Sequence, residues 1–375
     1  MTTRFGFVST YPPTLCGLAT FNASLFAALA LAGSPSGRVV RVVDSPQPET
    51  GAEVMGQLVN GESGSLHRAV RALSAFDVVI VQHEYGIYGG PDGDEVLALL
   101  SALSVPSIVV LHTVLATPTP HQRYVLENVI ALADAVVTMT ATARDRLAAD
   151  YTADMSKVNV IPHGTAAVRP GLNPAFRTGQ PTILTWGLIG RGKGIEWGIE
   201  AMSHLTDMSP MPNYIVAGQT HPKVVAWEGE AYRSELTAQI RRLGLANSVV
   251  LDNHYRHAAA LAELVSTADV VLLPYNSTEQ VTSGVLVEAV AAMKPVVATP
   301  FPHAVELLSD GAGVLVPYHD AAAIAVALRE IVTDAERAAR MAHAAAALTT
   351  DVLWPHVAAQ YRTLAGRLLS ERAAA

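Results

Sequence analysis

The chain has 375 residues, of which 50% are hydrophobic and 15% are charged, and its formal net charge is −8. A chain of this length usually forms two domains, and the acidic balance argues against general nucleic-acid binding. The single cysteine, Cys16, excludes an internal disulfide and a cysteine-based zinc site, which fits a reducing compartment. Because the N-terminus lacks a signal-peptide layout and no apolar run approaches the roughly 20 residues that span a bilayer, we expect a cytoplasmic protein. Peripheral contact with the inner face of the membrane stays open, and so does the oligomeric state.

Short apolar runs alternate with helical patterns along the whole chain. Most of these runs are β-branched throughout, which is typical of strands buried on both faces of a parallel sheet. Helical stretches such as 94–103 and 232–243 supply the crossovers, so we predict an α/β fold with two doubly wound parallel sheets of about six strands each. The predicted strands are residues 5–9, 39–43, 78–81, 108–111, 135–139 and 158–161 in the first half, and 183–186, 214–217, 249–251, 270–273, 296–298 and 314–316 in the second.

A polar stretch at residues 166–181, which holds three prolines and two glycines, separates the two sets of strands. Such a composition is typical of a linker between domains. We therefore predict an N-terminal domain at residues 1–170 and a C-terminal domain at residues 171–352. A final helix, from about residue 354 to about residue 372 within the segment 353–375, follows the second sheet and could pack on either domain.

Ligands of open α/β sheets bind beyond the carboxyl ends of the strands, so the residues that follow each predicted strand are the first candidates for a site. After the first strand, the sequence YPPTLCGLATF (residues 11–21) places Cys16 and Gly17 at the start of a helix, where a ligand can approach the backbone amides. A plain strand-to-helix turn explains the same residues equally well.

Polar side chains also follow the third and fourth predicted strands. His83, Glu84 and Tyr85 come after the third strand and His112 comes after the fourth, so they should point toward one crevice. One histidine at a strand end is more often structural, but two imidazoles and a carboxylate in adjacent positions favour a polar site. Neither histidine has a spacing typical of zinc ligands, so we expect no metal there.

A glycine-rich turn lies in TWGLIGRGKGIEWGIEAM (residues 185–202), between a predicted strand and a helix. Gly187 ends the strand, and Arg191 and Lys193 are separated and flanked by further glycines. A phosphate loop that holds magnesium needs serine or threonine at position 194, where this chain has glycine. Two cations and free backbone amides suit a diphosphate without a metal, although an ordinary solvated turn would have the same pattern.

The sequence EQVTSGVLVEA (residues 279–289) follows another predicted strand and leads into an apolar helix. Ser283 or the preceding threonine caps that helix, so the amides of Ser283 and Gly284 would face a phosphate or sugar oxygen. Glu288 lies four residues beyond Gly284 on the same side of the helix, and a carboxylate in so apolar a helix needs a polar partner, such as vicinal ribose hydroxyls. Gln280 lies in the loop before the cap. The alternative interpretation is the ordinary start of a buried helix.

Taken together, these features resemble the retaining GT-B glycosyltransferases of family four, and the resemblance covers nearly the whole chain. The family's usual arginine would stand nearer Leu188, so Arg191 would act from a shifted position. The matches in the first half are the loop with Pro12, Pro13 and Gly17, in which Cys16 replaces a usual glycine, His112 in VVLHT, and VIPHG at residues 160–164. Those in the second half are Lys193 with Gly194, and Trp354 at the start of the last helix. Of the family's two glutamates, Glu288 matches the second, and Gln280 stands at the position of the first.

The resemblance implies two Rossmann-like, doubly wound parallel-sheet domains (GT-B) with a cleft between them. The acceptor would bind on the N-terminal side and the sugar nucleotide on the C-terminal side, and the final helix would cross back to the N-terminal domain. The implied activity is a retaining, metal-independent transfer of a hexose from a nucleoside-diphosphate sugar, GDP-mannose ahead of UDP-glucose. The hydroxyl acceptor would be a molecule such as a glycan or glycolipid, and no cofactor is expected.

The resemblance also implies roles for the matching residues. Lys193 and Arg191 would neutralise the diphosphate leaving group, and His112 would lie near the hexose and the reacting centre. Glu288 would bind the ribose. The other expected donor-binding residues are Gly17, Gly187, Gln280, Ser283, Gly284, Val285 and Leu286. The expected lining of the acceptor or sugar cleft is Cys16, His83, Glu84 and Tyr85.

Three other functions compete with this interpretation. A sugar-nucleotide 2-epimerase of the same fold would share the donor site but would need acid and base carboxylates, for which Glu84 is the candidate. A phosphate-loop NTPase is disfavoured by Gly194 and by the duplicated sheet architecture. Asp92 and Asp94, which resemble paired metal-binding aspartates, are interpreted as the start of a helix. A non-catalytic module would bind the sugar nucleotide without turnover.

Overall fold

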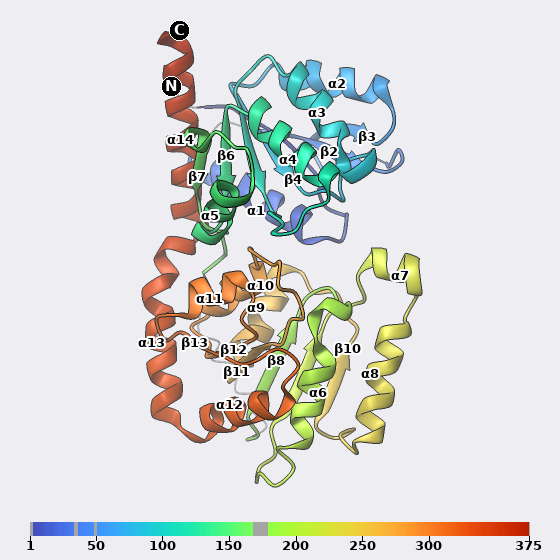
Figure 1. Cartoon of the computed structure of the whole chain (residues 1–375), viewed down its shortest axis with the longest axis vertical. Coiled ribbons are helices and arrows are strands. Elements are labelled where there is room, and N and C mark those ends of the chain that lie inside the picture. The colour runs from blue at the N-terminus through green and yellow to red at the C-terminus, as the bar shows by residue number, and fades with distance from the viewer. Residues whose placement is uncertain (1–2, 34–36, 49–50, 168–178, 375) are drawn as a thin grey trace. The chain divides into compact units, whose positions relative to one another are not determined.

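The computed structural model describes residues 3–33, 37–48, 51–167 and 179–374. The chain divides into two compact units, and the first of them is discontinuous in sequence (Figure 1). Unit 1 comprises Met1–Gly164 and Trp354–Ala375, and unit 2 comprises Thr165–Leu353. The predicted boundary lay between residues 170 and 171, and residues 168–178 of the predicted linker lie outside the described residues.

The sheet of unit 1 has seven parallel strands in the order β3-β2-β1-β4-β5-β6-β7. The central strands are buried along their whole length, which explains their unbroken apolar sequences. The strands are β1 (Phe5–Ser9), β2 (Arg38–Val43), β3 (Val54–Val59), β4 (Val78–His83), β5 (Ser107–Leu111), β6 (Ala135–Thr138) and β7 (Val158–Val160).

Strand β3 was not predicted from the sequence. Its residues, VMGQLV, include Gly56 and Gln57, and only Val54 and Leu58 are buried. The strand lies at an edge of the sheet, where one side of the backbone has no neighbouring strand. An edge strand needs less apolar surface than a central one, so its pattern is weak.

The helices of unit 1 include one from the far end of the sequence. Residues of α14 (Trp354–Ala374) share one apolar core with α1 (Gly17–Leu31) and with inward-facing residues of the sheet. Val357, Tyr361 and Leu364 are among the α14 residues in this core, next to Phe5 and Leu25. The remaining α-helices of this unit are α2 (Ser63–Leu73), α3 (Glu95–Ala102), α4 (Pro120–Leu132) and α5 (Ala141–Asp150).

The sheet of unit 2 has six parallel strands, the number that the sequence predicts, and their order is β10-β9-β8-β11-β12-β13. One apolar core lies under α6, α8 and α12, and a second one lies under α9, α10 and α11. The strands are β8 (Thr182–Trp186), β9 (Asn213–Ala217), β10 (Val249–Asp252), β11 (Val270–Leu273), β12 (Val296–Ala298) and β13 (Gly313–Leu315). The helices are α6 (Ile195–Ser203), α7 (Pro222–Glu228), α8 (Ala231–Arg242), α9 (Ala258–Thr267), α10 (Gly284–Ala291), α11 (Pro302–Leu308), α12 (Ala321–Thr333) and α13 (Ala335–Val352).

The two parallel α/β units confirm the predicted fold class. Within the described ranges, no helix combines the length and the apolar character needed to cross a bilayer. In both units, the predicted site residues lie in the loops and helix starts that follow parallel strands, which is where open α/β sheets bind their ligands.

Candidate functional site

The glycine-rich turn of unit 2 lies directly against the loop that follows β11. Gly194 has a φ of +61°, and a Cβ atom placed on it would come within 1.9 Å of the carbonyl oxygen of Pro274. The amide of Asn276 donates a hydrogen bond to the carbonyl oxygen of Gly192 at 3.0 Å. Glycine at position 194 is therefore required by close backbone approach, and it fixes the turn at the carboxyl ends of β8 and β11.

Lys193 has an ammonium group that is available to a ligand. Its Nζ lies 4.1 Å from the centre of the Tyr275 ring, and no ion pair joins it to a carboxylate of the described residues. Tyr275 is buried and stacks on Phe301, with ring centres 5.0 Å apart. A cation held on an aromatic face and lacking a counter-ion suits an anionic ligand. Tyr275 was missed from the sequence, although it directly follows a strand and a proline.

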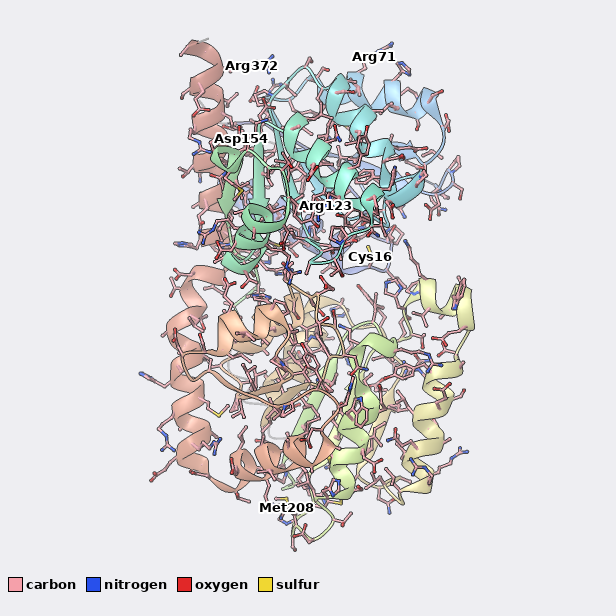
Figure 2. The ribbon with its side chains drawn as sticks, in the orientation of Figure 1. Cys16, Arg71, Arg123, Asp154, Met208 and Arg372 are labelled. Carbon is pink, nitrogen blue, oxygen red and sulfur yellow. The ribbon has the colours of Figure 1, made fainter. Side chains whose placement is uncertain are left out.

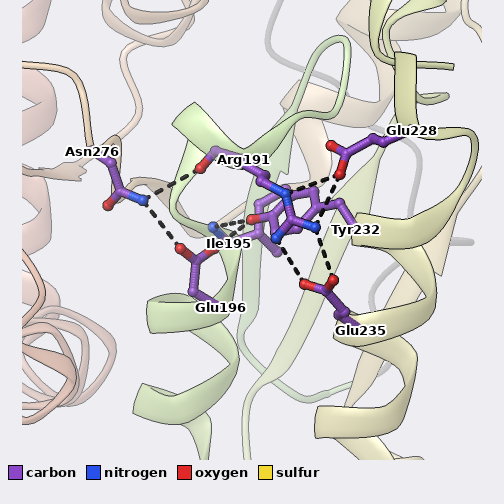
Figure 3. Close-up of polar contacts among 7 residues, drawn as sticks. All are labelled: Arg191, Ile195, Glu196, Glu228, Tyr232, Glu235 and Asn276. Atoms are coloured by element: carbon purple, nitrogen blue, oxygen red, sulfur yellow. Dashed lines mark hydrogen bonds and ion pairs between the residues drawn. The ribbon is translucent and has the colours of Figure 1, made fainter. Parts of the chain in front are cut away.

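Arg191 is paired with two carboxylates of unit 2. Its guanidinium donates to Glu228 Oε2 from Nε at 3.1 Å and from Nη2 at 3.0 Å, and to Glu235 through both Nη atoms at 2.8 Å (Figure 3). It also lies over the Tyr232 ring at 5.3 Å. These two carboxylates tie the turn to α7 and α8 through Arg191, and the role of this residue as a diphosphate ligand stays a prediction.

The first turn of α10 offers fewer free amides than predicted. Ser283 Oγ accepts the amide of Leu286 at 3.3 Å, and the amide of Ser283 donates to Nδ1 of His303 at 2.8 Å. The Ser283 amide is therefore occupied, and the fully buried Leu286 side chain belongs to the apolar core. These two residues support the helix start, and the amides of Gly284 and Val285 remain for a ligand.

Glu288 is a partly buried carboxylate with one oxygen in use. Trp186 Nε1 donates to its Oε2 at 2.9 Å, and Oε1 accepts no hydrogen bond from the described residues. Burial raises the pKa of Glu288, whereas the bond from Trp186 lowers it. Oε1 therefore remains for a donor such as a ribose hydroxyl. The sequence did not predict Trp186 as a site residue, because its position indicates the last residue of a buried strand.

Gln280 lies in the loop before α10 and folds toward its own backbone. The side-chain Nε2 of Gln280 donates to the backbone carbonyl oxygen of Thr282 at 3.1 Å. The backbone carbonyl oxygen of Gln280 accepts the amide of His303 at 3.3 Å. The side-chain Oε1 is left as an acceptor. Nearby, a Cβ atom on Gly187 would lie 3.7 Å from Val285, so these two predicted residues adjoin each other.

In unit 1, the predicted helix start at Cys16 and Gly17 is open. Cys16, labelled in Figure 2, is the N-cap of α1, and its Sγ accepts the amide of Ala19 at 3.4 Å and contacts Thr10 Oγ1 at 3.2 Å. A Cβ atom on Gly17 would meet nothing within 4 Å. A ligand can therefore approach the first amides of this 15-residue helix.

His112 is held in a defined tautomer. Gln82 Nε2 donates to Asn22 Oδ1 at 3.3 Å, so Gln82 Oε1 is the acceptor for His112 Nε2 at 2.8 Å. Burial, with lesser effects from His163 and His83, lowers the pKa of His112 to about 3. At neutral pH the imidazole is therefore uncharged, with its proton on Nε2 and an acceptor at Nδ1.

The residues after β4 are tied to the loop after β5. Glu84 Oε2 accepts a short hydrogen bond from Thr113, and Glu84 Oε1 accepts the amide of Tyr85 at 3.1 Å. His83 is fully buried, and burial lowers its pKa to about 4. Its ring lies 5.3 Å from that of Tyr85. The structure thus brings His83, Glu84 and Tyr85 together, with the His83 ring buried beneath the other two.

Asp92 and Asp94 form a link between helices. His121 Nδ1 lies 3.0 Å from Asp92 Oδ2, and His121 Nε2 lies 3.6 Å from Asp94 Oδ2. Asp94 occupies the N-cap position of α3, at the helix start that the sequence predicts, and its side chain makes no capping hydrogen bond. Among the described residues, no group of three or more histidine, cysteine, aspartate or glutamate side chains is arranged to hold a metal.

Two doubly wound parallel units of this kind define the GT-B class of fold. The model of the family "Glycosyltransferase Family 4" matches residues 22–168, and the model "Glycosyl transferases group 1" matches residues 173–347. The two matches together span most of the chain, one for each sheet. The chain belongs to the GT-B glycosyltransferases that these two family models describe.

Relatives and solved structures agree with this placement. A D-inositol 3-phosphate glycosyltransferase from Stackebrandtia nassauensis is 32% identical over 272 residues, which are 68% of this chain and 59% of that protein. A glycogen synthase from Mycobacterium tuberculosis is 27% identical over 70% of this chain and 63% of its own length. The chain thus spans about three fifths of these relatives. The fold is shared with a sucrose-phosphate synthase of Thermosynechococcus elongatus, at a TM-score of 0.78, 19% identity and coverage of 98% and 100% of the two chains.

Proposed function

We propose that this protein transfers a hexose from a nucleoside-diphosphate sugar to a hydroxyl acceptor, with retention of the anomeric configuration and without a metal ion. The observation that carries the proposal is Lys193, an unpaired cation on a turn that glycine brings against the loop after β11. Glu288, with a free Oε1, follows β11 in the same unit.

The donor-site roles follow from the chemistry of these groups. Lys193 and the amides of Gly284 and Val285 stabilise the negative charge that develops on the leaving diphosphate. Glu288 accepts the ribose hydroxyls through Oε1. Gln280 binds a hexose hydroxyl through its own Oε1. GDP-mannose and then UDP-glucose are the donors we place first, as the family resemblance implies.

His112 contributes as a neutral hydrogen-bonding group. With its proton fixed on Nε2 by Gln82, Nδ1 accepts a hydrogen bond from a hexose hydroxyl. No carboxylate nucleophile is needed if an oxygen of the leaving phosphate takes the proton of the attacking hydroxyl. The names of the relatives give two acceptor classes, a cyclitol phosphate and a growing glucan.

The first test is a thermal-shift panel of GDP, UDP and their sugars in excess chelator. A nucleotide present at a hundredfold over its Kd should stabilise the protein by about 2.7 kcal/mol. The Lys193→Gln variant should lose most of this shift and more of the transfer rate, because diphosphate charge increases in the transition state. No shift with any nucleotide, or a shift that appears only when magnesium or manganese is added, would overturn the proposal.

A further inference from the structure

Arg41 is a buried arginine within β2, two residues before the strand ends, and it contacts the loop that precedes α1. Only 5% of its surface is exposed. Its Nη2 donates to Thr14 Oγ1 at 2.8 Å, and Thr14 lies in the loop between β1 and α1. Residues 14–16 of this loop are partly exposed, and Gly17, the first residue of α1, is exposed. The guanidinium therefore lies directly behind an accessible edge of unit 1.

This buried cation lacks a counter-ion. No ion pair links Arg41 to a carboxylate in the part of the chain that the structure describes, and its Nε is buried without a hydrogen-bond partner. Buried charges are otherwise paired or fully hydrogen-bonded, because an unpaired one costs several kcal/mol. Thr14 is neutral and satisfies only one of the five N–H donors.

Two further polar side chains in the layer between the sheet and α1 lack hydrogen-bond partners. Ser9 is the register partner of Arg41 on β1 and therefore shares its face of the sheet, and Ser9 Oγ is buried without a hydrogen bond. Nδ2 of Asn22, on α1, is also buried and unpartnered. The layer between this part of the sheet and α1 thus has surplus donors and a net positive charge, which an anion would complement and an apolar ligand would not.

We propose that Arg41 and Thr14 bind an anionic group of the acceptor, namely a phosphate monoester. A guanidinium binds phosphate through two parallel hydrogen bonds, and the threonine hydroxyl adds a third. This inference rests on the proposed function, since it names the acceptor class of that reaction. It selects the phosphorylated small acceptor over the growing glucan. The site lies on the same sheet as His112, which is held by Gln82 at the end of β4.

The direct test is a titration of inorganic phosphate, read by thermal shift, with GDP or UDP saturating the donor site. The wild-type protein should show a saturable stabilisation. The Arg41→Gln variant should bind phosphate about ten- to a hundredfold more weakly, the loss expected for a charge-assisted contact. The matched control is Arg38→Gln, on the same strand, which should respond as the wild type does. Equal phosphate affinity in Arg41→Gln and wild type would overturn the proposal, as would a wild type that does not respond.

Transfer to matched acceptors separates phosphate from other anions. The ratio of kcat/KM for a cyclitol phosphate over the free cyclitol should be large in the wild type and should fall about ten- to a hundredfold in Arg41→Gln. For a cyclitol carboxylate, the ratio of kcat/KM over that of the free cyclitol should be smaller than the ratio for the phosphate. If Arg41→Gln lowers kcat/KM for charged and uncharged acceptors by the same factor, Arg41 does not recognise the anion.

Two further measurements keep the outcome interpretable. Arg41→Met removes an unpaired buried cation, so the ligand-free protein should be at least as thermostable as wild type while its phosphate response is lost. Lys193→Gln should lose the nucleotide shift and keep the phosphate shift. If nucleotides fail to bind while phosphate still responds through Arg41, the proposed function falls and the anion site stands.

Discussion

By the family resemblance, Gln280 takes the place of a glutamate, which exchanges a charge for an amide of equal length. Its Nε2 is used within the loop and its Oε1 is not. A single neutral acceptor is enough for a sugar hydroxyl but would add little to the binding of a nucleotide. The role of this residue should therefore depend on the sugar.

We predict that Gln280→Ala leaves the Kd of the bare nucleoside diphosphate nearly unchanged and reduces transfer efficiency by about 1–3 kcal/mol, or roughly five- to a hundredfold. Gln280→Glu should keep substantial activity. Calorimetry with GDP or UDP and steady-state kinetics provide the comparison. An equal loss in nucleotide affinity and in transfer would show that Gln280 only supports the loop.

At Glu288, burial and a hydrogen bond act on one carboxylate in opposite directions. Burial raises its pKa and the Trp186 indole lowers it. The ionised form accepts ribose hydroxyls, so nucleotide affinity should decrease as the pH falls through the pKa of Glu288. Removing the indole N–H should move this decrease to higher pH.

We predict that Trp186→Phe binds nucleotide nearly as well as wild type at about pH 8 but loses affinity at a higher pH on acidification. Glu288→Ala should be about ten- to a hundredfold weaker at pH 8 and should lack this pH dependence. Calorimetric Kd values from about pH 8 to about pH 5 distinguish the three proteins. Identical pH profiles for wild type and Trp186→Phe would exclude the indole as a determinant of the carboxylate's charge.

At the scale of elements, the turn after β8 is held from two sides. The loop after β11 fixes its backbone, and Arg191 ties it to α7 and α8 through Glu228 and Glu235. The guanidinium is half-exposed, so each ion pair contributes little to overall stability. We therefore expect Arg191 to act locally, by holding the Lys193 ammonium in position.

We predict that Arg191→Gln lowers nucleotide affinity by less than about tenfold, whereas Lys193→Gln lowers it by more, because only Lys193 contacts the diphosphate. The salt dependence of nucleotide binding should decrease in Lys193→Gln and stay unchanged in Arg191→Gln. If both variants lose the same affinity and the same salt dependence, Arg191 is a direct ligand after all.

Much of this element-level picture could be predicted because strand ends and glycines mark it in the sequence. Lys193, Glu288 and His112 all follow buried apolar runs. The side-chain pairs could not be predicted, since Trp186 and Glu288 are 102 residues apart and the partners of Arg191 are 37 and 44 residues away. Such pairs depend on how helices pack, which no local pattern specifies.

At the scale of the whole molecule, unit 1 depends on the last helix of the chain. Val357, Tyr361, Leu364 and Leu368 of α14 are buried in its core. Burying each large apolar side chain contributes about 1.5–3 kcal/mol, so the four together contribute about 6–12 kcal/mol. This is comparable with the entire stability of a typical domain, about 5–15 kcal/mol.

We predict that a chain ending at residue 353 has an unfolded or aggregated unit 1, while a chain ending at residue 370 keeps wild-type stability. The second chain retains every α14 residue of the core. Circular dichroism and limited proteolysis would reveal protected fragments. A cooperative two-unit melting profile for the chain ending at residue 353 would contradict this dependence.

The discontinuity of unit 1 also sets an order of events during translation. The segment of unit 2, residues 165–353, is continuous and leaves the ribosome before the final helix has been released. Domains usually fold as they emerge, from the N-terminus onward. In this chain the sheet made first must wait, with its α14-facing core residues uncovered, until α14 has been synthesised. Unit 1 is thus the last part of the chain to finish folding, and it is the unit that most needs chaperones during synthesis.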